Sequence, residues 1–301
     1  MEGGKSLINI GELAKPATVL IEKISDAIGG YFKPYQIRRV AQAEAEAEKI
    51  KALSQIESQM EIAELTQRAL GRFLAEETKK QDNIESITSK ALPFLEENSK
   101  PQEINDDWIT NFFDKCRLIS DEEMQSLWAR VLAGEANSPG KFSKRTINFL
   151  ESLDKSDAIL FANLCSFGWI IGDFMLLIYE VGTNSSIYSK HGIDFGALKH
   201  LDDIGLLSFN PFSEYKHIRF PKFTLVVYFG SLIIIEFPKQ EGNELHVGHA
   251  MLSKIGHELA PICGSKPIPD FLDYVIKRWI NRGLILASPW NMVPRTPSPA
   301  G

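Results

Sequence analysis

The longest helical pattern in this chain covers residues 35–91, and its middle reads Ala41-Gln42-Ala43-Glu44-Ala45-Glu46-Ala47-Glu48-Lys49-Ile50. Alanine, glutamate, glutamine and lysine are among the strongest helix formers. Only one glycine, Gly71, falls inside the stretch, and the nearest prolines stand outside it. The pattern predicts one long helix, since some 40–55 residues at ~1.5 Å each would span about 60–80 Å. A helix of that length extends beyond one compact domain.

Apolar residues recur along this helix at near-heptad spacing and form a seam. Its members are Val40, Ala43, Ala47, Ile50, Leu53, Ile56 and Met60, followed by Ala63, Leu70 and Leu74. A seam of this kind packs against another helix, which belongs either to the same chain or to a second copy. The sequence thus predicts a helical hairpin or a coiled coil. We expect the protein to form a homo-oligomer or a helical bundle.

Three basic residues, Lys33, Arg38 and Arg39, lie where the long helix begins. The helix macrodipole is already positive at this end, so these cations do not stabilise the helix. They could contact the phosphate groups of a lipid or a nucleic acid, or an acidic protein partner. A solvated face is the simpler interpretation, and the sequence leaves these alternatives open.

A short amphipathic segment precedes the long helix. Residues 16–32 carry apolar side chains at helical spacing, namely Val19, Leu20, Ile24, Ala27, Ile28 and Tyr31. This stripe either packs on the long helix or makes a peripheral contact with a membrane. Interfacial helices usually have a polar face rich in lysine and arginine, and the polar face here is mixed. Packing within the protein is therefore favoured.

The fold class expected for the whole chain is mainly α with an α+β C-terminal part. Its expected segments are two N-terminal helices in residues 1–98, a small helical bundle in 99–167, an α+β domain in 168–288 and a disordered proline-rich tail in 289–301. In the bundle, Ser120 and Glu123 have the spacing of a capping box, which predicts a helix ending at Gly134.

The expected C-terminal domain has a winged-helix-like order of elements. Residues 170–179 predict a strand, and Gly230-Ser231 between two apolar runs predicts a β-hairpin. A helix over residues 193–207 ahead of that hairpin is similar to the second half of a winged helix. Its acidic residues, Asp194, Asp202 and Asp203, oppose phosphate. The net charge of −6 agrees, so a protein partner is favoured over nucleic acid.

No pattern in the sequence indicates an enzyme, a metal site or a cofactor. His246, His249 and His257 can be aligned with a metal motif, but an offset of three on a strand points the first two side chains to opposite faces. No acidic or thiolate ligand completes the set. Residues 134–141 place glycines around a lysine, but they follow a helix and include a proline, unlike a phosphate-binding loop.

Cysteine usage and hydropathy predict a cytoplasmic protein. The three cysteines are widely spaced and odd in number, which fits a reducing compartment rather than a disulfide framework. No secretory signal is visible in the first residues. The longest apolar run, residues 223–237, is shorter than the ~20 residues that a membrane-spanning helix needs.

Several stretches carry a family resemblance. They read Pro34-Tyr35-Gln36-Ile37-Arg38-Arg39-Val40-Ala41-Gln42-Ala43-Glu44-Ala45 and Ser120-Asp121-Glu122-Glu123-Met124-Gln125-Ser126-Leu127-Trp128-Ala129-Arg130-Val131-Leu132-Ala133-Gly134-Glu135, with residues 142–146 and 201–207. In this order they resemble an uncharacterised bacterial family known as a domain of unknown function, related to the abortive-infection Alpha proteins. The resemblance implies a cytoplasmic bacterial protein with a part in defence against phage. It transfers no catalytic residue.

Three hypotheses about function follow from these observations. The first is a non-enzymatic, self-associating interaction protein of bacteria, in which the long helix forms the oligomer and the C-terminal part binds a protein partner. The second is a membrane-acting effector that uses the N-terminal amphipathic helix. The third is a nucleic-acid-binding regulator that uses the winged-helix-like end. We rank them in that order.

Overall fold

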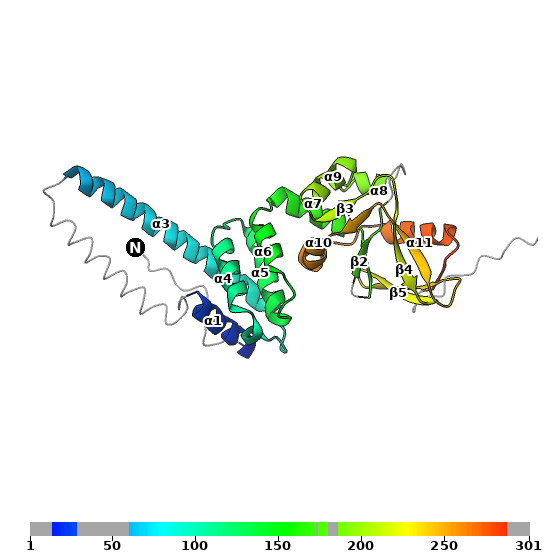
Figure 1. Cartoon of the computed structure of the whole chain (residues 1–301), viewed down its shortest axis with the longest axis horizontal. Helices are drawn as coiled ribbons and strands as arrows, with labels where there is room; N and C mark the ends of the chain where they lie inside the picture. The colour runs from blue at the N-terminus through cyan, green and yellow to red at the C-terminus, as the bar shows by residue number, and fades with distance from the viewer. Residues whose placement is uncertain (1–13, 29–59, 173, 180–185, 288–301) are drawn as a thin grey trace, which may run out of the picture. The chain divides into compact units, whose positions relative to one another are not determined.

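The computed structural model describes residues 14–28, 60–172, 174–179 and 186–287, and it separates the chain into two compact units (Figure 1). Unit 1 is Met1–Ser152 and unit 2 is Leu153–Gly301. The sequence suggested boundaries at residues 98 and 167 instead. The polar segment near residue 98 lies inside unit 1 because the helices on either side of it pack together. The helix before residue 167 belongs to unit 2.

Unit 1 is built from helices. They are α1 (Lys15–Ala27), α3 (Met60–Ala91), η2 (Leu92–Phe94), η3 (Pro101–Glu103), α4 (Asp106–Cys116), α5 (Glu122–Asn137) and α6 (Lys144–Glu151). Aromatic rings fill the core, where Phe112 stacks on Trp108 and meets Trp128 edge-on, each with 5.2 Å between ring centroids. The helical N-terminal half that the sequence predicted is confirmed.

The two ends of α5 differ from the sequence prediction. Asp121, not Ser120, caps the helix, because its carboxylate accepts hydrogen bonds from two backbone N–H groups of the first turn. The helix also continues beyond Gly134. Glycine at 134 serves packing rather than helix termination, since an added Cβ would lie 2.7 Å from the ring of Phe142.

Helices α1 and α3 both pack on the core of unit 1. Leu20 and Ile24 of α1 are fully buried, and α1 packs mainly on α4 and η3 rather than along the described part of α3. In α3, Ile84, Ile87 and Ala91 are buried, and this end of the helix packs against α5. Apolar burial of this kind, at ~25 cal/mol per Å², is the main force that holds the helices together.

A polar network also joins α3 to α5. The Asn83 side-chain amide donates to the backbone oxygen of Arg117 at 2.8 Å, and the Gln125 amide donates to the Asn83 oxygen at 3.2 Å. Ser86 and Lys90 donate to the Gln125 oxygen at 2.7 Å each. Since the buried amides of Asn83 and Gln125 are satisfied, the network fixes one register of α3 on α5.

Unit 2 combines helices with antiparallel strands, which confirms an α+β C-terminal part. Its helices are α7 (Lys155–Cys165), α8 (Ser186–Ser189), α9 (Phe195–Asp203), α10 (Lys254–Leu259), η4 (Ala260–Ile262) and α11 (Phe271–Asn281). Its strands are β1 (Gly168–Ile171), β2 (Phe174–Leu177), β3 (Leu207–Phe209), β4 (Tyr215–Phe220), β5 (Phe223–Tyr228), β6 (Ser231–Glu236), β7 (Asn243–Gly248), β8 (Ala250–Leu252) and β9 (Ile285–Ala287).

Five strands of unit 2 form one antiparallel sheet in the order β2-β1-β5-β6-β9. The predicted hairpin is present as β5 and β6, but its two-residue loop is Phe229-Gly230, one position earlier than expected. The strand predicted over residues 170–179 is instead the hairpin β1–β2. Gly172, with φ of 59°, lies in the turn between these two strands, where a positive φ is required.

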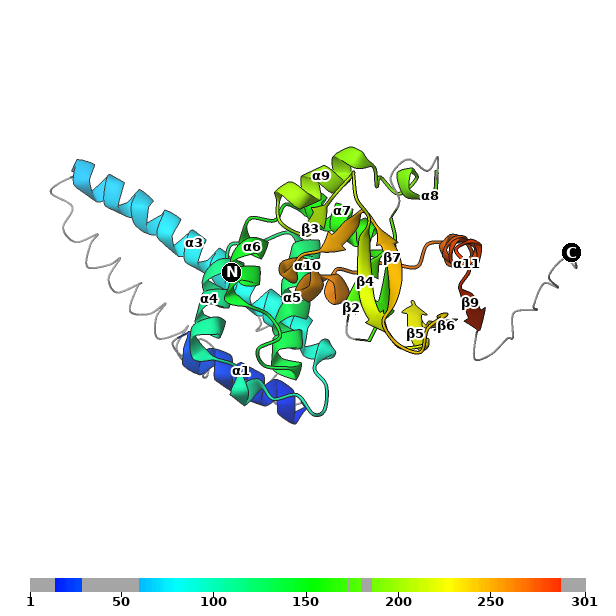
Figure 2. The same ribbon diagram turned by 45° about the vertical axis from the view of Figure 1, so that its right-hand side comes forward.

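The remaining strands pair in two short ladders, β3 with β8 and β4 with β7 (Figure 2). The strand that follows α9 therefore pairs with β8 rather than with β4, the next strand, so the winged-helix-like arrangement is not confirmed. The end of β7 approaches residue 179 closely. Gly248 has φ of 114°, and a Cβ there would lie 1.7 Å from the backbone oxygen of Tyr179. Only glycine fits at this crossing.

The predicted contact residues Lys33, Arg38 and Arg39 and the seam residues Val40, Ala43, Ala47, Ile50 and Leu53 lie outside the described residues, as does the tail expected at 289–301. The last seam residue, Met60, is the first residue of α3. The helical hairpin and the coiled coil therefore stay predictions.

Candidate binding surfaces

The first half of α3 extends beyond the other described helices of unit 1 (Figure 1). Leu65 and Phe73 on this half are 64% and 54% exposed. Phe73 lies about three helical turns before Ile84, so both residues fall on the same face of the helix. Between these two residues the same face carries the ion pair of Glu77 with Lys80, so Phe73 is an exposed apolar residue beyond the packed end of α3 rather than part of an unbroken apolar stripe.

The five-stranded sheet of unit 2 has one covered face. Trp169, Val226 and Tyr228 point to this side and are buried. Two rings of α11 cover it: Trp279 meets Trp169 with 4.8 Å between ring centroids, and Phe271 lies 5.6 Å from Tyr228. The Tyr228 hydroxyl accepts a hydrogen bond from the backbone N–H of Ile268 at 2.8 Å, which holds the chain just before α11. Large aromatic rings and a satisfied hydroxyl close this face.

The opposite face of the same sheet is open and mostly apolar, with Glu236 between Phe223 and Ile285. Ile170 pairs with Val227 and Leu225 with Ile234, and cross-strand partners in antiparallel strands share one face. Large side chains on or beside this face that are exposed are Ile170, Phe223, Leu225, Phe229 and Ile285. Contiguous apolar surface of this kind marks an interaction or ligand site more often than scattered apolar residues do.

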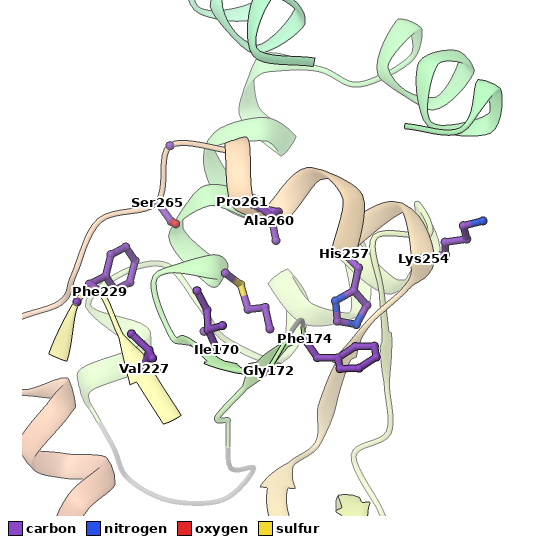
Figure 3. Close-up of a pocket in the computed structure, with 14 residues that line it drawn as sticks. Ile170, Gly172, Phe174, Val227, Phe229, Lys254, His257, Ala260, Pro261 and Ser265 are labelled. Atoms are coloured by element: carbon purple, nitrogen blue, oxygen red, sulfur yellow. The ribbon is translucent and has the colours of Figure 1, made fainter. Parts of the chain in front are cut away.

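A pocket of about 840 Å³ lies between one end of the open face and the segment that contains α10 and η4 (Figure 3). The sheet contributes Ile170, Phe174 and Val227, with Met175 beside them, and η4 contributes Ala260 and Pro261 from the opposite side. The remaining lining residues are Gly168, Gly172, Phe229, Gly230, Lys254, His257, Gly264 and Ser265. Ligand sites commonly have ~300–1,000 Å³ and mostly apolar walls, and this pocket has both properties.

Two basic side chains of α10 lie at one side of the pocket. The His257 ring meets the Phe174 ring edge-on at 6.0 Å, and burial lowers the pKa of its imidazole. Lys254 is exposed at the edge, with its side chain directed outward (Figure 3). Neither side chain forms a hydrogen bond or an ion pair with another residue in the described ranges. The fourteen lining residues include no carboxylate, so the pocket wall has positive or neutral character.

Phe229 occupies a strained position at the pocket wall. It and Gly230 form the β5–β6 loop, and both have positive φ, 43° for Phe229 and 87° for Gly230. Two-residue hairpin loops with this geometry favour asparagine, aspartate and glycine. A bulky side chain at positive φ costs roughly 1–3 kcal/mol, and such strain clusters at functional sites. The ring of Phe229 is nevertheless exposed there.

The three histidines that could be aligned with a metal motif lie in three different environments. His246 hydrogen-bonds Glu214 at 2.7 Å, His249 contacts the backbone oxygen of Asn210 at 2.9 Å, and His257 lines the pocket. Glu214 also accepts from Arg282 at 3.1 Å. Burial acts to raise the pKa of Glu214, but the hydrogen bonds from His246 and Arg282 outweigh it and the pKa is lowered. This group of charges ties α11 to the β4–β7 ladder.

The glycine-flanked lysine segment, residues 134–141, has a structural role. The Glu135 carboxylate is buried and accepts the backbone N–H groups of Gly140 at 2.7 Å and Phe142 at 2.9 Å. These N–H groups are the kind that a phosphate-binding loop would offer to its ligand. The internal carboxylate already occupies them, so the segment does not offer an anion site.

The described helices show no feature of a membrane span. Within the described ranges, no helix combines the length and the apolar character that crossing a bilayer requires. In α1, the apolar residues that would enter a membrane surface, Leu20 and Ile24 among them, face the interior of unit 1. Lys23 on the same helix forms an ion pair with Asp106 of α4.

Sequence reasoning missed the pocket and the open face. The pocket assembles from β1, β2, the β5–β6 loop and α10, which lie up to ~90 residues apart in the chain, and only one local signal pointed to it. That signal is a phenylalanine in a hairpin loop that normally takes asparagine or glycine. The continuous apolar runs of the strands hid the difference between their two faces.

The comparisons with known proteins identify a family without assigning an activity. Residues 67–276 match the family model described as a protein of unknown function, DUF2806. No curated protein and no solved structure matches the chain. The match extends over most of the chain, from the exposed half of α3 through both units to α11, and the chain belongs to this family.

Proposed function

We propose that this protein is a non-enzymatic interaction protein that associates with copies of itself through α3. The observation that carries the proposal is the exposure of two large apolar side chains, Leu65 and Phe73, on the half of α3 that lies beyond the core of unit 1. Phe73 lies on the face that Ile84 uses against α5, whereas Leu65 lies about 100° around the helix from Ile84, and both side chains are exposed. Covering such side chains in an oligomer would remove apolar area from water at ~25 cal/mol per Å².

The biological setting that we propose rests on the motifs of the sequence. Residues 34–45 resemble bacterial proteins related to the abortive-infection Alpha group, and residues 120–135 resemble the uncharacterised bacterial family that is related to them. We therefore propose a cytoplasmic bacterial protein that takes part in defence against phage, with unit 2 as the part that binds another molecule. A testable consequence is that a bacterial population carrying the gene would survive phage challenge. A population carrying the double variant Leu65→Glu/Phe73→Glu, which should not self-associate, would not survive.

Neither alternative function gains support from a specific contact. A membrane-acting effector would have to detach α1 from unit 1 and expose Leu20 and Ile24, which are fully buried. A nucleic-acid-binding α9 would need free cations. Lys199 on that helix is instead engaged by Asp202 and Asp203, each within ion-pair distance.

The self-association is tested by the mass of the full-length protein in solution. We expect the wild type to be an oligomer in light scattering after size exclusion, and the double variant Leu65→Glu/Phe73→Glu to be a monomer. Carboxylates at these two positions would have to be desolvated without partners in the assembled form, which is strongly unfavourable. Both side chains are exposed, so the variant keeps its helical circular dichroism.

The matched control changes exposed apolar residues elsewhere in unit 1. The double variant Phe94→Glu/Leu118→Glu replaces side chains that are 50% and 60% exposed but lie outside α3. It should keep the wild-type mass. A monomeric wild type at micromolar concentration, or equal loss of assembly in the two double variants, would refute self-association through α3.

A further inference from the structure

Every residue that lines the pocket belongs to unit 2, so the proposed self-association through α3 does not explain it. Its walls, formed by Ile170, Phe174, Met175, Val227, Phe229, Ala260 and Pro261, are apolar. An apolar site with these dimensions excludes a small hydrophilic ion, because such an ion would lose its hydration without gaining hydrogen bonds. The walls therefore favour a ligand with an apolar body.

The polar groups of the pocket are not distributed evenly. Lys254 and His257 are three positions apart on α10, so they lie on the same side of that helix. Lys254 sits at the solvent edge and His257 deeper, next to Phe174. An amphipathic ligand would place its head beside Lys254, in contact with water, and its apolar body against the sheet.

Phe229 supplies an independent indication that the pocket binds something. The loop that contains it has a geometry for which phenylalanine is unfavourable, and its ring is exposed at the wall rather than packed in the core. Stability alone would favour asparagine at this position. A ligand that packs on the ring would explain why phenylalanine occupies this position.

We propose that the pocket between the open sheet face and α10 binds a small apolar molecule that carries one anionic group, such as a medium-chain fatty acid. The apolar chain packs on Ile170, Val227 and Phe229, and the carboxylate lies at the rim beside Lys254. This inference is independent of the proposed self-association, because every lining residue belongs to unit 2.

The first experiment compares three probes on the full-length protein by isothermal titration calorimetry. Decanoate has both the apolar chain and the charge, decanol has the chain alone, and acetate has the charge alone. We expect decanoate to bind with one molecule per chain, decanol to bind roughly two- to fivefold more weakly, and acetate not to bind. The factor is modest because the lysine is exposed and its charge is screened by water.

Two variants with matched controls locate the site. Ile170→Glu places a carboxylate on the wall and should weaken decanoate at least about tenfold, whereas Ile218→Glu, at an exposed isoleucine of β4 outside the pocket, should not. Lys254→Gln should remove the preference for decanoate over decanol. Lys277→Gln, at an exposed lysine of α11, should leave that preference intact. The lysine variants change solvent-exposed side chains and leave the fold unaffected.

The outcomes decide the proposal. Binding that requires an intact wall and prefers the anion supports it. Absence of decanoate binding, equal affinity for decanol and decanoate, or equal weakening by Ile218→Glu would overturn it. Vesicles of phosphatidylglycerol distinguish the source of the ligand: binding to vesicles as well as to monomeric decanoate indicates a lipid in its membrane, and binding to decanoate alone indicates a free acid. Vesicle binding unaffected by Ile170→Glu would count against the pocket.

Discussion

The two faces of the five-stranded sheet are made by alternate residues of the same strands, but only one of them is covered. Trp169, Val226 and Tyr228 lie on the covered face and are buried, whereas their neighbours Ile170 and Leu225 are exposed. Both sets are apolar, so composition does not explain the difference. The covered face forms the core of unit 2, and the open face has the properties of a binding surface.

Helix α3 repeats this contrast along its length. Ile84 and Ile87 on its second half are buried against the rest of unit 1, and Leu65 and Phe73 on its first half are exposed. In both units, apolar surface that folding would normally cover is left accessible. Mutations in the covered regions should therefore lower stability, whereas mutations in the open regions should weaken binding.

The largest effect is expected under α11. Trp279→Ala removes a fully buried indole that packs on Trp169, and large-to-small changes of this kind cost about 3–5 kcal/mol. Ile280→Ala, at the next position but 45% exposed, should cost less than ~1 kcal/mol. Urea unfolding followed by tryptophan fluorescence measures both. Similar losses in the two variants would show that α11 does not form the covered side of the sheet.

Mutations in the two halves of α3 should likewise have different effects, one on stability and the other on assembly. Ile87→Ala leaves a cavity in unit 1 and should lower the free energy of unfolding by about 2–5 kcal/mol at any protein concentration. Phe73→Ala should act through assembly instead. The unfolding midpoint of the wild type should rise with protein concentration, because oligomers are stabilised by mass action, and that dependence should weaken in the variant. A midpoint independent of concentration in both proteins would contradict the contrast.

The helix that covers the closed face is held by a titratable contact. Glu214 has a lowered pKa, because hydrogen bonds from His246 and Arg282 outweigh its burial, and Arg278 also lies near it. A carboxyl whose pKa is lower in the folded state stabilises the protein above its unfolded pKa of ~4.3, and this contribution is lost as the pH falls through the folded value.

Glu214→Gln tests that contact. The variant should be less stable by about 1 kcal/mol at pH 7, and the difference from the wild type should shrink below pH ~4. The control is Glu244→Gln, which removes a carboxylate that pairs with Lys216 at 3.2 Å and is half exposed. Surface pairs of that kind contribute little, so the control should follow the wild type closely. If the difference in unfolding free energy between Glu214→Gln and the wild type stayed constant from pH 7 to 3, the Glu214 carboxylate would be excluded as the source of the stabilisation.

Several elements of the fold could be predicted because their signals are local. The apolar periodicity of residues 16–32 predicted α1, and the apolar runs around Gly230 predicted the β5–β6 hairpin. Each of these depends on residues within a few positions of one another. The cap at Asp121 was missed because Ser120 offered an equally plausible local pattern.

Other features could not be read from the sequence because they depend on distant contacts. The role of Gly134 becomes clear only when the ring of Phe142 lies against it, and Gly248 is required only because Tyr179 crosses there. The pairing of β3 with β8 joins segments some 40 residues apart. Strand runs that are apolar throughout do not reveal which face a helix will cover. The candidate pocket belongs to this class.

The smallest expected effect is also the sharpest test of the open face. Phe229→Asn puts a favoured residue at the first position of the β5–β6 loop, so it should relieve strain at positive φ. The ring of Phe229 also meets Tyr228 edge-on at 5.0 Å, a contact worth about 0.5–1.5 kcal/mol. The two effects oppose each other, and we expect a net gain in stability of up to about 1 kcal/mol.

The same variant should weaken decanoate binding, because the ligand would lose an aromatic wall. A residue that lowers stability and raises affinity belongs to a binding surface, where strain is retained for function. Thermal unfolding and calorimetry on one preparation measure the two quantities together. If Phe229→Asn instead destabilised unit 2 by more than ~1 kcal/mol and left decanoate binding unchanged, the ring would be part of the core. The open face would then differ from the covered one in exposure alone.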